Sequence, residues 1–359
     1  MTTPYRVGII GAGAVADLHA EAIAHIEDAT LVAACRRSEA PGRAFAERHG
    51  CTWYPAYETM LDEAAPDVVI ITTPSGAHLP PTEAAAQRGI HVLCEKPLEI
   101  TTDRVDRMIA VADAHGIRLG GIFQQRFSDV MRVMREAVSE GRLGDLAAAT
   151  ASVPWWRDDA YYEGTWKGTQ ALDGGGALIN QSIHALDALQ WMVAGTMDLG
   201  PREHPVAEVY AFTDVRGHDP AHMEGEDTAV AVLRWRNGAL GHVLGSTALY
   251  PGSQQRLRVA GRDGTIELLE EELVQWQFRE PRPEDDTVRQ RFGAQRGASG
   301  ASDPMAIDYE GHARNIKAFL DGIEGTHRFS LDGRAARKAV ALVEAIYRSA
   351  ETGRPVHLD

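Results

Sequence analysis

Residues 7–16 read Val-Gly-Ile-Ile-Gly-Ala-Gly-Ala-Val-Ala, and this stretch decides the fold of the first part of the chain. Its apolar start predicts a strand, and the apolar residues from Val15 onward recur at helical spacing. Gly11, Gly13 and Ala16 therefore stand between a strand and a helix, which is the context of a dinucleotide-binding turn. Such a turn holds a pyrophosphate at the N-terminus of the helix. The expected contacts are Gly11, Gly13, Ala14 and Val15.

The rest of the first third of the chain repeats this alternation of strand and helix. Helical spacing recurs over 81–88 and 102–115. Short apolar runs predict further strands at 31–35, 68–72, 90–94 and 117–123. Strands and helices that alternate with short turns predict a doubly wound parallel sheet of the Rossmann type over residues 1–123.

Residues 124–359 change character. One long helix is predicted at 177–193, a loop at 280–304, and two closing helices at 309–324 and 333–350. Alternating segments predict strands at 147–153, 207–212, 228–235, 240–246, 256–260 and 265–269. The fold class is therefore α/β, with a second, α+β domain over 124–359 that is built on a large, mostly antiparallel open sheet.

Composition limits the classes of partner. The 359 residues are 44% apolar and 24% charged and carry a net charge of −15, which disfavours binding to nucleic acid. No apolar stretch approaches about 18 residues and no secretory signal is recognisable, so we expect a cytoplasmic protein that does not bind membranes. The three cysteines lack CxxC spacing, and no cluster of His, Cys or carboxylate has metal-ligand spacing, so no metal is expected.

The end of the second predicted strand indicates which dinucleotide binds. An acid about 20 residues after the glycine turn would select NAD through the ribose hydroxyls. Here Arg36, Arg37 and Ser38 occupy that place, and the first acid is Glu39. Two guanidiniums and a hydroxyl suit a 2′-phosphate, so the sequence favours NADP over NAD. The alternative is that both arginines are solvated and that NAD binds through the backbone.

Two further motifs carry the chemistry. Residues 92–98, Val-Leu-Cys-Glu-Lys-Pro-Leu, end a strand and leave Lys96 where a doubly wound sheet opens its crevice. Residues 174–184, Gly-Gly-Gly-Ala-Leu-Ile-Asn-Gln-Ser-Ile-His, predict a helix on which Asn180, His184 and Asp187 share one stripe. An imidazole titrates near neutral pH, so His184 suits a general acid or base.

The glycine turn, Glu95-Lys96-Pro97 and His184, in that order, resemble the family of glucose-fructose oxidoreductase and inositol dehydrogenase. The resemblance covers essentially the whole chain. It implies an enzyme, an NAD(P)-dependent oxidoreductase that transfers a hydride between a secondary hydroxyl of a sugar, glycoside or cyclic polyol and the nicotinamide. It also implies that Lys96 contacts the reacting hydroxyl and the cofactor ribose, and that His184 moves the proton.

One position departs from the common pattern. Many members of the family have a carboxylate where this chain has Asn180, and an asparagine positions a hydroxyl but does not accept its proton. The segment 174–184 contains this Asn180 and is preceded by Tyr161, Tyr162 and Trp166. In these features it resembles the subgroup of the family that acts on glycosides and nucleotide sugars, in part at C3.

Weaker expectations complete the site. Further cofactor contacts are expected at Thr73, Pro74, His78 and Glu95, and further substrate contacts at Gln124, Arg126, Trp166 and Asn180. For Arg126 an ion pair between domains is an equal alternative. Asp173 is interpreted as a helix cap, with contact to the substrate as the less favoured alternative. The chain is expected to form a dimer or tetramer through its second sheet. Two other functions stay open: coupling of two sugars through a tightly held cofactor, and a non-catalytic sugar or nucleotide sensor.

Overall fold

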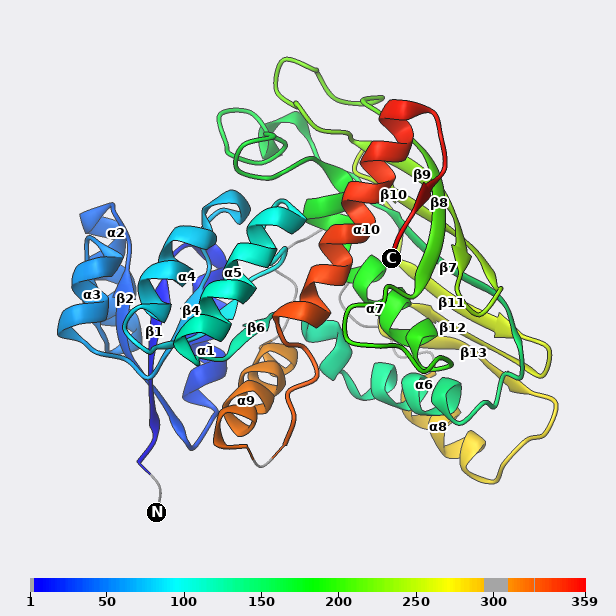
Figure 1. Cartoon of the computed structure of the whole chain (residues 1–359), viewed down its shortest axis with the longest axis horizontal. Coiled ribbons are helices and arrows are strands. Elements are labelled where there is room, and N and C mark those ends of the chain that lie inside the picture. The colour runs from blue at the N-terminus through cyan, green and yellow to red at the C-terminus, as the bar shows by residue number, and fades with distance from the viewer. Residues whose placement is uncertain (1–2, 294–308, 326) are drawn as a thin grey trace. The chain divides into compact units, whose positions relative to one another are not determined.

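The structure, a computed structural model, describes residues 3–293, 309–325 and 327–359. Its contacts divide the chain into two compact units, one of Met1–Gln124 with Asp308–Arg337 and one of Gln125–Ile307 with Lys338–Asp359. Figure 1 labels the elements of both units. Within the described residues, no helix is both long and apolar enough to cross a membrane.

The first unit is built on a parallel sheet, as predicted. Its strand order is β3-β2-β1-β4-β5-β6, so the order reverses between β1 and β4. The strands are β1 (Tyr5–Ile10), β2 (Ala29–Cys35), β3 (Thr52–Tyr54), β4 (Val68–Ile71), β5 (His91–Cys94) and β6 (Leu119–Gly121). The helices are α1 (Ala14–Ala24), α2 (Glu39–His49), α3 (Tyr57–Glu63), α4 (Leu79–Ala86), α5 (Thr102–His115) and α9 (Glu310–Glu324), with a short 3₁₀ turn η1 (Ser75–Ala77).

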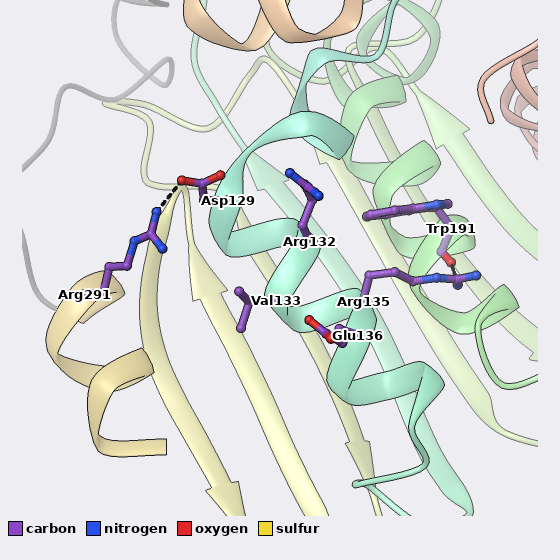
Figure 2. Close-up of a pocket in the computed structure, with 7 residues that line it drawn as sticks. All are labelled: Asp129, Arg132, Val133, Arg135, Glu136, Trp191 and Arg291. Atoms are coloured by element: carbon purple, nitrogen blue, oxygen red, sulfur yellow. Dashed lines mark hydrogen bonds and ion pairs between the residues drawn. The ribbon is translucent and has the colours of Figure 1, made fainter. Parts of the chain in front are cut away.

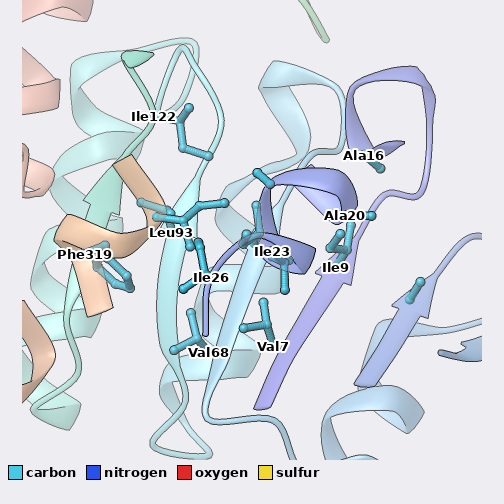
Figure 3. Packing of buried hydrophobic residues seen from close by; sticks show 14 of the residues in the cluster. Val7, Ile9, Ala16, Ala20, Ile23, Ile26, Val68, Leu93, Ile122 and Phe319 are labelled. Carbon is cyan, nitrogen blue, oxygen red and sulfur yellow. The ribbon is translucent and has the colours of Figure 1, made fainter. Parts of the chain in front are cut away.

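Helix α1 is held by an apolar face of small residues. Ala16, Ala20 and Ile23 are spaced by four and three residues, and all three are buried in the cluster shown in Figure 3. Phe319 of α9 belongs to the same cluster and is 1% exposed. The sequence places residues 309–324 in the second domain, whereas the structure packs α9 in the first unit.

The second unit contains an eight-stranded sheet, in the order β13-β12-β11-β7-β10-β9-β8-β14. Neighbouring strands are antiparallel except for β10 and β7, so the predicted mostly antiparallel sheet is confirmed. The strands are β7 (Leu146–Pro154), β8 (Val206–Asp214), β9 (Thr228–Trp235), β10 (Leu240–Ser246), β11 (Arg256–Gly261), β12 (Gly264–Leu269), β13 (Glu272–Phe278) and β14 (Val356–His357). Strands β13 and β14 were not expected from the sequence.

The helices of this unit differ from the prediction in two places. The single helix predicted at 177–193 is a π-helix, η4 (Ala177–Ser182), that continues as α7 (Ile183–Ala194). The segment predicted as a loop contains α8 (Glu284–Phe292), whose charged surface hides the helical pattern, and its part from residue 294 on lies outside the described residues. The remaining helices are α6 (Asp129–Ser139) and α10 (Gly333–Thr352), with 3₁₀ turns η2 (Gln124–Phe127) and η3 (Asp159–Tyr161).

Candidate functional site

The glycine turn after β1 requires glycine at its first position. Gly11 has a φ of 103°, and a Cβ on it would lie 2.7 Å from the main-chain nitrogen of Thr73. The N–H groups of Gly11 and Ala12 both donate to the carbonyl of Cys35 at 3.0 Å. Thr72 Oγ1 donates to the carbonyl of Gly11 at 2.7 Å. The turn is therefore fixed from the strands on both sides of β1.

Gly13 leaves room in front of helix α1. It directly precedes the helix, and no side chain caps the first turn. Among the described residues, the one atom within 4 Å of a Cβ built on Gly13 is the carbonyl oxygen of Gly11, at 3.7 Å. A pyrophosphate at this place would meet the N-terminal N–H groups and the positive end of the helix dipole. The residues of the turn therefore fit a bound dinucleotide.

Arg36 lies against the glycine turn. Its Nη1 donates to the carbonyl of Ala12 at 2.7 Å, and its own carbonyl accepts from Trp53 Nε1 at 3.0 Å. The side chain is half-buried, whereas Arg37 and Ser38 are exposed. A guanidinium is thus held at the end of β2, where the ribose of a dinucleotide is usually recognised.

The loop after β4 is tied to the loop after β5 by a buried histidine. His78 is 1% exposed, and its ring nitrogens lie 2.8 Å from the carbonyl oxygen of Thr73 and 3.0 Å from that of Pro97. Burial lowers the pKa of the imidazole, although the carbonyls of Thr73 and Leu98 and the charge of Glu99 oppose this. His78 therefore holds the two loops together, and Pro74 caps the 3₁₀ turn in the first of them. Its predicted cofactor contact, like those of Thr73 and Pro74, stays a prediction.

Lys96 follows β5 and is held through its neighbour. Glu95 Oε2 accepts the main-chain N–H of Lys96 at 3.0 Å, and Glu95 Oε1 accepts from His19 Nε2 of α1 at 2.7 Å. The Lys96–Pro97 peptide bond is cis. Glu95 is 7% exposed, and burial would raise its pKa, but the hydrogen bond from His19 and the nearby charges outweigh burial and lower the pKa.

His19, Glu95 and His312 of α9 form a buried cluster that the sequence analysis missed. One donor atom from each lies within 4.8 Å of the others, a set of ligand types that also suits zinc. However, the 2.7 Å between His19 Nε2 and Glu95 Oε1 is the length of a hydrogen bond, so the pair is bonded directly. The cluster joins the cofactor helix α1 to the loop that carries Lys96. His19 is the sixth residue of α1, among apolar residues at helical spacing, and gave no signal of this cluster in the sequence.

Asn180 lies in a network of polar side chains in the π-helix η4. Its Nδ2 donates to Asp173 Oδ1 at 2.6 Å, and its Oδ1 accepts from Gln181 Nε2 at 3.0 Å. Asp173 is fully buried and also accepts the N–H of Gly168 at 2.7 Å. The interpretation of Asp173 as a helix cap is therefore wrong, because its carboxylate orients the Asn180 amide instead. The nearby Trp166 is half-buried.

His184 is half-buried on the first turn of α7, and Asp187 lies three residues further on. The Asp187 carboxylate accepts from Arg126 Nε at 2.6 Å and from Nη2 at 2.5 Å. Burial raises the pKa of Asp187, although the Arg126 charge opposes this. This bidentate pair lies within the second unit, so it anchors α7. A substrate contact for Arg126 stays a prediction.

Gln124 packs against Gly311 of α9. It is the last residue of the first of the two chain segments that form the first unit. Its Oε1 is buried and has no hydrogen-bond partner among the described residues. A buried polar atom of this kind is costly unless something else satisfies it, which is consistent with the predicted ligand contact.

A pocket of about 520 Å³ lies in the second unit, and none of the predicted site residues lines it. Figure 2 shows it between α6, Trp191 of α7 and Arg291 of α8, with Asp129 and Arg291 paired at its edge. Arg135 points to Trp191 and donates to the carbonyl of Met192 at 3.1 Å. The Arg135 guanidinium is therefore occupied by main chain, and the pocket lies between helices.

The fold and the site define a class, an oxidoreductase with a nucleotide-binding Rossmann unit. Residues 5–122 match the oxidoreductase family with an NAD-binding Rossmann fold, and residues 131–267 match the GFO/IDH/MocA C-terminal domain. The chain therefore belongs to the GFO/IDH/MocA oxidoreductase family, as the resemblance implied.

Several relatives are named dehydrogenases of sugars or polyols. D-glucoside 3-dehydrogenase of Escherichia coli is 29% identical over 99% of this chain and 98% of its own length. Myo-inositol 2-dehydrogenase of Thermotoga maritima is 26% identical over 99% and 98%. The crystal structure of the WlbA dehydrogenase from Bordetella pertussis, in complex with NADH and UDP-GlcNAcA, has a TM-score of 0.87 and 30% identity, covering 100% of this chain and 99% of that one.

Proposed function

We propose that this enzyme oxidises a secondary hydroxyl, at C3 of a glycoside or nucleotide sugar, with NADP or NAD as hydride acceptor. The observation that carries the proposal is the placement of Lys96 at the carboxyl end of β5, in the same sheet as the glycine turn and fixed by the buried Glu95. The named activities of the relatives support the substrate class.

Each residue of the site has one task in this scheme. The Lys96 ammonium bonds the reacting hydroxyl and stabilises the alkoxide as charge develops on its oxygen. His184 accepts the hydroxyl proton as general base. Asn180, oriented by Asp173, positions a hydroxyl with its amide but cannot take the proton. The bound nicotinamide supplies the hydride acceptor.

A substrate panel separates this function from its alternatives. Free sugars, methyl glucosides, inositol and UDP-sugars are incubated with NAD or with NADP, and absorbance of the reduced cofactor is followed. We expect turnover with glycosides or UDP-sugars. Turnover that needs a second sugar and no added cofactor would instead indicate the coupled reaction, and binding without turnover would indicate a sensor.

The cofactor preference rests on Arg36. Replacing Arg36 by aspartate is expected to lower the ratio of NADP to NAD affinity about ten-fold or more, because a charge-assisted bond to the 2′-phosphate is lost. The ratio is the informative quantity, since Arg36 also bonds the turn itself. Arg48→Asp, an equal charge change at an exposed residue of the same unit, should leave the ratio unchanged. An unchanged ratio in the Arg36 variant would show that this residue does not recognise the ribose.

We infer that the outer face of β8 and β9, in the second sheet, is covered by another copy of the chain. Val232 on β9 is 55% exposed between Tyr210 and His242, and Val230 beside it pairs with Phe212, which is 67% exposed. A contiguous apolar surface of this kind marks an interface. When the mass of the assembly in solution is measured at about 10 µM, Val232→Asp should form a smaller assembly than the dimeric or tetrameric parent. Val274→Asp, a change at an exposed residue of β13, should assemble like the parent. A monomeric parent would contradict the inference.

A further inference from the structure

Three consecutive main-chain N–H groups at the start of the π-helix η4 donate hydrogen bonds to one residue, Glu226. The N–H of Gly176 donates to Oε2 at 3.1 Å, and the N–H of Leu178 donates to Oε1 at 2.7 Å. Between them, the N–H of Ala177 donates to the Glu226 carbonyl at 2.8 Å. A single residue thus holds the start of the π-helix from both its side chain and its main chain.

The main chain at residues 175–176 packs directly against the main chain at residues 225–226, with no room for side chains between them. A Cβ on Gly176 would lie 1.9 Å from the carbonyl oxygen of Glu226, and one on Gly225 would lie 2.3 Å from the carbonyl carbon of Gly175. The turn that Glu226 holds continues into the site, because the N–H of Asn180 donates to the carbonyl of Gly176 at 3.1 Å. A shift at Glu226 is therefore transmitted to Asn180.

The surroundings of the Glu226 carboxyl favour its neutral form. Burial raises the pKa of Glu226 to about 7, although the N–H donors of Leu178 and Gly176 and the Tyr347 phenol of α10 oppose the rise. Burial raises the pKa of the Tyr347 phenol, and the charges of Glu226 and Asp173 raise it further. The neighbouring Asp227 carboxylate turns away, toward the N–H groups of residues 216–218.

The two protonation states hold the turn differently. An ionised carboxylate is an acceptor only, so both oxygens can receive the N–H groups of Gly176 and Leu178. A protonated carboxyl has a hydroxyl that cannot accept as well from the N–H in front of it, so one of the two bonds is weakened.

We propose that Glu226 is a positioning residue whose ionised carboxylate, by receiving the N–H groups of Gly176 and Leu178, fixes the start of the helix carrying Asn180 and His184 in the arrangement that oxidation needs. The catalytic part of this inference rests on the proposed function. The holding of the turn does not, because it concerns the second unit alone.

Hydrogen exchange tests the hold without any need for turnover. At pH 8, where the carboxylate is ionised, protection of a peptide covering residues 174–180, corrected for intrinsic exchange, should be lower in Glu226→Gln than in the parent, because the amide has one acceptor oxygen for the two N–H groups. Glu226→Asp, whose shorter side chain cannot reach both N–H groups, should show the same loss and takes the place of the first variant if that variant does not fold. Glu224→Gln is the control, because Glu224 is exposed and bonds the N–H of Gln170. Parent-like protection in a folded Glu226 variant would overturn the proposal.

Kinetics test the consequence for catalysis. Above about pH 8, Glu226→Gln should lower kcat about ten-fold with little change in KM, because a misplaced site loses rate without losing contacts. An unchanged kcat in a variant with altered exchange would overturn the positioning role. A parent without turnover on any sugar would overturn the proposed function instead, while the exchange result would still decide whether Glu226 holds the turn.

The free energy of unfolding gives a separate test of the environment of Glu226. A carboxyl whose pKa is raised by folding contributes stability below its unfolded pKa, and this is lost as pH rises through the folded value. Between about pH 4.5 and pH 7, the free energy of unfolding of the parent, relative to that of Glu226→Gln, should therefore fall. A difference that rises over this range would contradict the assigned environment of Glu226.

Discussion

Lys96→Met abolishes turnover on this account, while cofactor affinity stays within about three-fold of the parent. Methionine keeps the length of the side chain but removes the ammonium that stabilises the developing alkoxide. Loss of one such electrostatic contact alone slows an enzyme by about 100- to 1,000-fold. Single-turnover kinetics and a cofactor titration measure the two effects separately.

The control is Lys317→Met, which removes a half-buried lysine of the same unit that pairs with Asp28. It should have parent activity. Parent-like turnover in the Lys96 variant would show that the lysine after β5 is not part of the reaction.

His184→Ala is expected to slow oxidation about 100-fold or more, the usual cost of a lost general base. No carboxylate replaces it at the reacting hydroxyl, because Asn180 cannot accept a proton and Asp187 is engaged by Arg126. Higher pH should restore part of the rate, since hydroxide or an ionised substrate then does the work of the imidazole.

The pH profile identifies the base. Oxidation needs the neutral imidazole, so the parent rate should rise with pH through an apparent pKa in the histidine range. The acid limb of log kcat against pH should be less steep by about one unit in the His184 variant, whether or not Glu226 adds a second ionisation. His222→Ala, at an exposed residue of the same unit, should retain the parent slope. An unchanged slope in the His184 variant would assign the proton to another group, with Asp187 the next candidate.

The parts of the fold that could be predicted are those set by local pattern. The sequence from Tyr5 to Ala24 contains the strand, the glycine turn and the helix in one continuous stretch, and all three occur as predicted. Helix α8 was missed because its nine residues are nearly all polar, so they lack the apolar stripe that indicates a helix. The placement of α9 in the first unit depends on Phe319 packing against α1, which no local pattern contains.

The site shows the same division between local and distant information. Lys96 and His184 could be predicted because short motifs surround them. The bond between His19 and Glu95 joins residues 76 positions apart, and Glu226 accepts bonds from residues 50 and 48 positions earlier. Such contacts leave no periodicity in a single sequence. These long-range contacts therefore emerged only from the structure.

Transfer of deuterium tests the central claim most directly. The best substrate of the panel is prepared with deuterium on all its ring carbons and is oxidised in ordinary water with NAD or NADP. The account predicts that the reduced nicotinamide contains one deuterium per turnover, and that the sugar gains one carbonyl, at C3. Reduced cofactor without deuterium, or a product without a new carbonyl, would contradict hydride transfer from a secondary sugar hydroxyl.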